Sequence, residues 1–129
     1  MTPRKPRKPL GKAGLLTEHM EQKLFVQWLD AKYPDVPYCA VPNGGKRSPI
    51  TGRRLKEEGV RKGTADVFIA EPRDGFHGLF IEFKTLGGKL KPEQKAFLAK
   101  VAANGYGAQV CVGQLEGIRA FEKYIGASE

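Results

Sequence analysis

The order of apolar patterns along the chain predicts an α/β fold, a mixed central sheet flanked by helices. Residues 17–33 carry apolar side chains at helical spacing, and two short β-branched and aromatic runs follow at 66–70 and 78–84, separated by turn formers. A helix–strand–helix pattern then fills the chain from Pro92 to Ile125. The predicted element order is therefore α-β-(α)-β-β-α-β-α.

The first helix is predicted to begin after Thr17, a suitable N-cap, and to end near Tyr33 and Pro34. Its core-facing residues are Met20, Leu24, Phe25, Trp28 and Leu29. On a helical wheel Glu21 falls within this apolar arc and Glu18 at its edge. An acidic side chain on a core-facing arc needs a partner. Alternatively, it interacts favourably with the positive N-terminal end of the helix dipole.

The next segment is predicted to be a strand over 36–41, which the residues Pro42, Asn43, Gly44 and Gly45 end. A polar loop and a short helix follow. The short helix closes over 55–58, and Gly59 suits its C-terminal cap.

The 66–70 and 78–84 strands are predicted to pair as a hairpin, and their charges are unusual. Glu82 and Lys84 share one face of the second strand, while Ile81 and Phe83 take the other. Asp66 opens the first strand and can lie near the charged face. Two carboxylates at an apolar sheet suit a hard cation such as Mg²⁺. The alternative for an E-x-K pair is a solvated face or a simple ion pair.

The C-terminal part is predicted to contain a helix with Pro92 at its first position and Gly105 at its end. A last strand is predicted over 107–113 and a last helix over 115–125. The strand would join the sheet, and the helix would pack on it.

The composition predicts one folded domain over 15–129 behind a basic disordered tail, 1–14. The tail holds five basic residues and no acid, so it carries most of the net charge of +8, which favours polyanions. No membrane span or signal peptide is expected, so secretion is not expected either. Cys39 and Cys111 are expected to be two buried free thiols, with no zinc site.

Four segments in order resemble the VRR-NUC branch of the PD-(D/E)XK nucleases, and the resemblance runs from about Thr17 to Tyr124. They are PNGGKR (42–47), LKEEGVRKGTADVFIA (55–70), GLFIEFK (78–84) and LKPEQKAFLAKVAANGY (90–106). Thr64 and Ala65 precede Asp66 where the superfamily name has a proline, and proline is not a metal ligand.

The resemblance implies a PD-(D/E)XK-like core and a Mg²⁺- or Mn²⁺-dependent DNA endonuclease. The implied metal ligands are Asp66, Glu82, the carbonyl of Phe83 and Glu18. Glu18 matches an E-x-x-x-Q pattern with Gln22, whereas the helical wheel favours Glu21, so both stay open. The implied catalytic residues are Asp66, Glu82, Lys84, which would orient or deprotonate the attacking water, and Gln94, near the metal water or the scissile phosphate. The implied DNA-binding residues are Asn43, Lys46, Arg47, Arg61 and Lys62.

The resemblance also implies selectivity for branched DNA, flaps or four-way junctions, and a homodimer. It further implies a cytoplasmic location in a bacterial or phage-infected host cell. The absence of a G-x-x-x-x-G-K-[ST] sequence argues against a nucleotide cofactor. Two other interpretations remain: a non-catalytic nucleic-acid-binding module with a salt-dependent affinity, and an RNA nuclease with the same chemistry.

Overall fold

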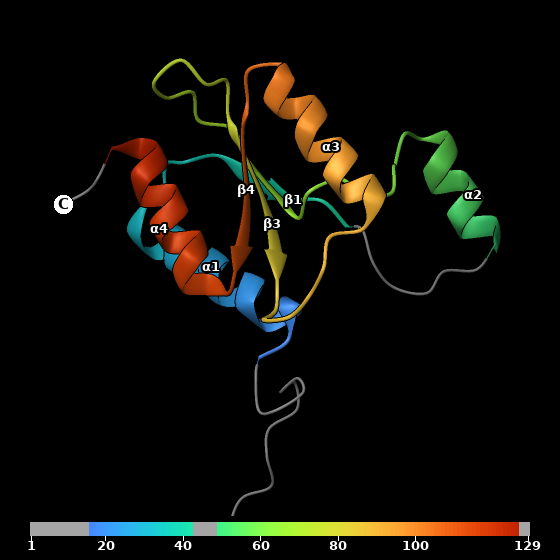
Figure 1. The fold of residues 1–129 in the computed structure, drawn as a ribbon, viewed down its shortest axis with the longest axis horizontal. Coiled ribbons are helices and arrows are strands. Elements are labelled where there is room, and N and C mark those ends of the chain that lie inside the picture. Colours follow the sequence, from blue (N-terminus) through green and yellow to red (C-terminus); the bar gives the residue numbers. More distant parts are fainter. Residues whose placement is uncertain (1–15, 43–48, 127–129) are drawn as a thin grey trace, which may run out of the picture. The chain divides into compact units, whose positions relative to one another are not determined.

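The computed structural model describes residues 16–42 and 49–126, and within them the predicted element order is present (Figure 1). The elements are α1 (Glu18–Lys32), β1 (Tyr38–Ala40), α2 (Pro49–Glu57), β2 (Val67–Ile69), β3 (Leu79–Lys84), α3 (Pro92–Ala103), β4 (Gly107–Val112) and α4 (Gln114–Ile125). The basic tail and three of the expected DNA-binding residues, Asn43, Lys46 and Arg47, lie outside the described residues.

The four strands form one sheet in the order β1-β2-β3-β4. β1 is antiparallel to β2, and β2 is antiparallel to β3. β4 runs in the same direction as β3 in Figure 1, so the sheet is mixed. This confirms the predicted α/β class, a mixed sheet flanked by helices.

The predicted hairpin is present and its register is fixed by three pairs: Val67 with Ile81, Phe68 with Phe80, and Ile69 with Leu79. Val67, Ile69, Leu79 and Ile81 are fully or almost fully buried on one face. On the opposite face the rings of Phe68 and Phe80 stack with their centroids 4.5 Å apart.

The hairpin loop narrows to a two-residue turn between Arg73 and Phe76, whose backbones exchange hydrogen bonds of 3.1 and 2.8 Å. Asp74 and Gly75 both adopt positive φ, 49° and 86°. Two consecutive positive φ angles match the right-handed twist of a hairpin, and Asp-Gly is a favoured pair for that turn. The turn chemistry expected from the sequence is therefore present.

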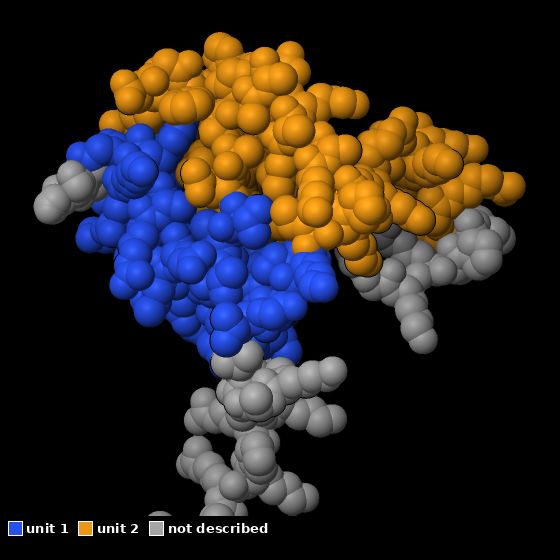
Figure 2. Space-filling view, in the orientation of Figure 1, with its two compact units in different colours: residues 1–35, 83–89, 110–129 blue, residues 36–82, 90–109 orange. Residues whose placement is uncertain are grey.

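The chain divides into two compact units, coloured in Figure 2: unit 1 comprises 1–35, 83–89 and 110–129, and unit 2 comprises 36–82 and 90–109. In the described part of unit 1, α1 packs on α4 around Phe25, Phe83 and Phe121, all fully buried. In unit 2 an aromatic cluster joins the hairpin to α3, because Phe80 contacts Phe97 and Tyr106 at centroid distances of 5.3 and 5.4 Å.

The two thiols differ in exposure. Cys111 on β4 is buried, and burial together with the nearby Glu116 carboxylate raises its pKa to about 12. Cys39 is exposed, so the expectation of two buried thiols is wrong for this residue. The reason is that β1 is a short strand at the edge of the sheet. Among the described helices, none combines the length and apolar character needed to cross a bilayer.

Gly117 makes the close packing of unit 1 possible. A Cβ at this position would lie 2.8 Å from Phe83 Cε1 and 3.1 Å from Phe25 Cδ1. Both rings are fully buried and have no room to withdraw. Glycine weakens a helix interior by about 1 kcal/mol, so its presence inside α4 reflects the space that the rings occupy.

We predict that Gly117→Ala lowers the free energy of unfolding by about 1–2 kcal/mol, because overpacking outweighs the gain in helix propensity. Gly52→Ala in α2 is the matched control, since a Cβ there meets nothing within 4 Å. Urea denaturation checks both variants. The packing explanation is wrong if Gly117→Ala is as stable as the Gly52→Ala control.

Candidate functional site

The candidate site is organised by the hairpin register. Continuing the pairing of Val67 with Ile81 by one residue places Asp66 opposite Glu82. Asp66 is also tied to the other neighbour of β2, because Val41 N, just after β1, donates to Asp66 O at 2.9 Å. Directly opposed residues have Cβ atoms about 4.5–5.5 Å apart, a spacing at which two carboxylates could share one cation. The β2–β3 register is therefore compatible with the two sequence-predicted ligands lying side by side.

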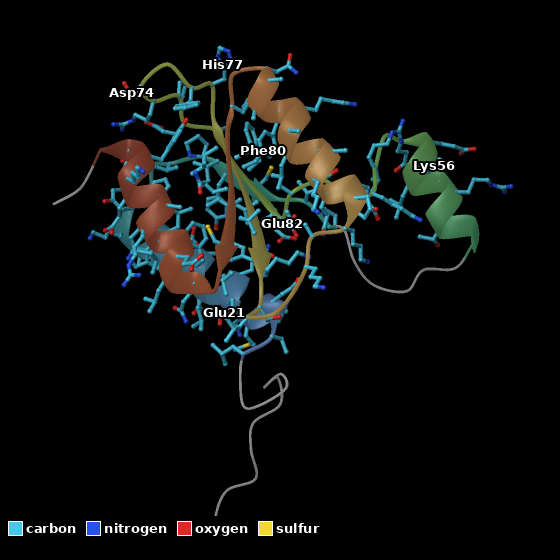
Figure 3. The ribbon with its side chains drawn as sticks, viewed as in Figure 1. Glu21, Lys56, Asp74, His77, Phe80 and Glu82 are labelled. Atoms are coloured by element: carbon cyan, nitrogen blue, oxygen red, sulfur yellow. The ribbon has the colours of Figure 1, made fainter. Side chains whose placement is uncertain are left out.

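Two of the predicted site residues are deeply buried charges on β3. Glu82 is 2% exposed and Lys84 is 7% exposed, and strand alternation puts both on one face. Figure 3 shows Glu82 beside the beginning of α3. Lysine and glutamate are almost never buried unless they are paired, so these positions indicate a built polar site and exclude a solvated surface pair.

Gln94 links the site to the first turn of α3. Its Nε2 donates to Glu82 Oε2 at 3.2 Å, and its Oε1 accepts from Lys91 N at 2.8 Å. The second oxygen of Glu82, Oε1, is buried and has no hydrogen-bond partner among the described residues. The sequence placed Gln94 in the site, and the structure identifies Glu82 as its contact.

The turn that precedes Asp66 packs closely against the first turn of α3, through Gly63 and Glu93. Gly63 has φ +84°, and a Cβ there would lie 2.5 Å from the backbone oxygen of Glu93. Only glycine accepts both the left-handed backbone and this close approach. Thr64 Oγ1 donates to Arg61 O at 3.0 Å and closes the turn.

The donor set fits a hard divalent cation. Within residues 16–42 and 49–126, no group of three or more His, Cys, Asp or Glu side chains is arranged to hold a metal ion. Mg²⁺ is usually held by one or two carboxylates together with waters and substrate phosphates, so the Asp66–Glu82 pair suffices chemically. Opposed like charges destabilise a sheet, and a shared cation would remove that repulsion.

The two candidate ligands of α1 have different positions. Glu21 Oε1 accepts from Gln114 N at 2.8 Å and so caps the beginning of α4. Gly113, just before it, has φ +89°, a left-handed backbone conformation that favours glycine. The partner expected for an acid on the core-facing arc is therefore α4. Glu18 is exposed in the first turn of α1, where the predicted cap is confirmed by Met20 N donating to Thr17 Oγ1 at 3.2 Å.

The basic residues before Asp66 are exposed, but they are not equivalent. Arg61 folds back, and its Nη1 donates to the carbonyls of Lys56 at 2.8 Å and Val60 at 3.2 Å. Lys62 is exposed. The helix α2 also exposes three basic side chains, and the assignment of DNA-binding residues from sequence did not include them. They are Arg53, Arg54 and Lys56.

A mixed four-stranded sheet flanked by helices, with opposed carboxylates on adjoining strands, defines a PD-(D/E)XK-like core. The VRR-NUC domain matches residues 16–115, and the chain belongs to the VRR-NUC family, which is a family of nucleases. A solved structure described as a VRR_NUC domain protein is similar with a TM-score of 0.71 and 26% identity, over 88% of this chain and 92% of that one. No curated protein matches the chain.

We predict that Glu21→Ala lowers the free energy of unfolding by about 1 kcal/mol, the usual cost of losing a helix cap. The exposed Glu18→Ala is the matched control on the same helix turn and should change stability by a few tenths of a kcal/mol through the helix dipole. Thermal or urea denaturation measures both. Equal effects of the two substitutions would contradict the capping role of Glu21.

Proposed function

We propose that this protein is a Mg²⁺- or Mn²⁺-dependent DNA endonuclease that hydrolyses phosphodiester bonds. The observation that carries the proposal is the β2–β3 register, which when continued by one residue sets Asp66 opposite Glu82, together with the burial of the Glu82 side chain. Membership of the VRR-NUC family supports the nuclease chemistry.

In this proposal Asp66 and Glu82 would hold the cation, and the carbonyl of Phe83 would be a further ligand. The carboxylate of Glu18 would add to them directly or through water. When bound, Mg²⁺ or Mn²⁺ lowers the pKa of a coordinated water and neutralises charge on the phosphate. Lys84 follows Glu82 by two positions on β3 and is buried, so its ammonium group is pre-organised within the strand. Its role is to orient or deprotonate the attacking water and to stabilise charge that develops on the phosphate.

We propose branched DNA, such as flaps or four-way junctions, as the preferred substrate. Contacts to the phosphate backbone come from Lys62 and the exposed basic face of α2. Arg61 adds the guanidinium N–H groups that do not bond the carbonyls of Lys56 and Val60. Such contacts read DNA shape and carry no base sequence, which suits a structure-selective enzyme. The expected homodimer stays a prediction, which light scattering with and without DNA checks.

We predict that Glu82→Gln and Lys84→Met each reduce DNA cleavage by at least about 100-fold, the scale at which loss of a transition-state charge contact acts. Cleavage of labelled linear duplex, flap and four-way junction in Mg²⁺, Mn²⁺ or EDTA measures this. Glu58→Gln, an exposed acid that follows α2, is the matched control and should cleave like wild type.

The outcomes separate the proposed function from its rivals. Metal-dependent cleavage that both substitutions abolish, with DNA binding retained, supports the endonuclease. Tight binding with no cleavage of any substrate, indifferent to metal and to both substitutions, indicates a non-catalytic binding module. Cleavage of the matching RNA panel in preference to DNA would assign the same chemistry to RNA.

We predict that the double variant Arg54→Gln, Lys62→Gln lowers the slope of log affinity against log salt by about 1.8, because each lost phosphate contact removes about 0.9. Binding to duplex DNA in EDTA, across a range of salt concentrations, measures the slope. Lys23→Gln with Lys123→Gln, exposed residues of α1 and α4, carries the same change in charge. If the slope falls equally in this control, the effect comes from the total charge of the protein, and α2 is not a DNA contact site.

A further inference from the structure

The first turn of α3 holds one carboxylate oxygen of Glu82 in a defined direction. Gln94 bonds at both ends of its amide: Oε1 accepts from Lys91 N at 2.8 Å, and Nε2 donates to Glu82 Oε2 at 3.2 Å. A backbone N–H only donates, and an ionised carboxylate only accepts. Both partners therefore require the same orientation of the amide, and neither end can flip without losing a bond.

The hydrogen bond from Gln94 restricts rotation of the Glu82 carboxylate about its terminal side-chain bond. The terminal torsion of a glutamate is broad and roughly two-fold, so backbone position alone does not fix the plane of its carboxylate. The bond from Gln94 supplies that constraint at Oε2. The donor of this bond is Gln94 Nε2, whereas the bond from Lys91 N to Gln94 Oε1 belongs to the cap of α3.

We propose that Gln94 is a positioning residue, which orients the Glu82 carboxylate for the cation and acts on the substrate only through Glu82. This inference rests on the proposed metal-dependent function. It refines the expectation that Gln94 lies near the metal water or the scissile phosphate, because one N–H of its amide is directed at Glu82 Oε2. Groups that orient a metal ligand typically contribute 10- to 100-fold in metal affinity or activity.

Gln94 also caps α3, so a purely structural role must be separated from positioning. Gln94→Met keeps the length of the side chain and removes both hydrogen bonds. Lys91→Pro removes the N–H whose hydrogen bond Gln94 accepts, and Lys91 has φ −77° and ψ 156°, which suit a proline followed by Pro92. The substitution also removes the positive charge of Lys91, a change that favours cation binding and so cannot mimic the loss expected for Gln94→Met. In Lys91→Pro the donor to Glu82 is retained, so this variant reports the loss of the cap.

The first measurement is Mn²⁺ binding by calorimetry to the full chain without DNA, with urea denaturation of each variant alongside. We expect Gln94→Met to bind Mn²⁺ at least 10-fold more weakly than wild type, and Lys91→Pro to bind it within about twofold of wild type. Both variants should show a similar loss of stability, about 1 kcal/mol, from the missing cap. Cleavage as a function of Mn²⁺ concentration should show the same order.

Three results would overturn the inference. If Gln94→Met binds Mn²⁺ as tightly as wild type but loses turnover or DNA affinity, Gln94 contacts the substrate itself. If Lys91→Pro and Gln94→Met weaken Mn²⁺ binding equally, the effect belongs to the helix cap. If Gln94→Met changes stability alone, its role is structural. Failure of wild type to bind Mn²⁺ would instead reject the proposed metal-dependent function, which keeps the two failures distinguishable.

Discussion

The pairing of Phe68 with Phe80 is the interaction on which the site depends. Their stacked rings, 4.5 Å apart, hold β2 and β3 in one register, and that register sets Asp66 opposite Glu82. Side chains alternate along a strand, so a slip of one residue would carry Glu82 to the face that Ile81 now occupies. The relative position of the two acids is therefore decided by apolar packing two residues away from them along each strand.

Local patterns made much of this fold predictable. The β2–β3 hairpin, the Asp74–Gly75 turn and the Thr17 cap each depend on a few residues close in the chain, and all three are present as expected. The assignment of Asp66 and Glu82 to neighbouring positions required only this hairpin. The sequence was informative wherever the deciding forces were short in range along the chain.

The remaining features depend on contacts that no local pattern specifies. The Glu21 carboxylate bonds the backbone of Gln114, 93 residues away, and the wheel argument showed only that Glu21 needed some partner. Gln94 reaches Glu82 across 12 residues, and its position on α3 did not reveal which group its amide meets. The exposure of Cys39 follows from the place of β1 at the sheet edge, which depends on strand order rather than hydropathy.

The first turn of α3 contacts the surroundings of both acids. Glu93 packs against the Gly63 turn that leads to Asp66, and Gln94 donates a hydrogen bond to Glu82. Helix ends open locally at a small fraction of the free energy of global unfolding. Fraying of this single turn would thus release both sides of the acid pair while the sheet stays intact. Heat would then disorder the site before it unfolds the protein, and amide exchange in 91–94 would report this earlier event.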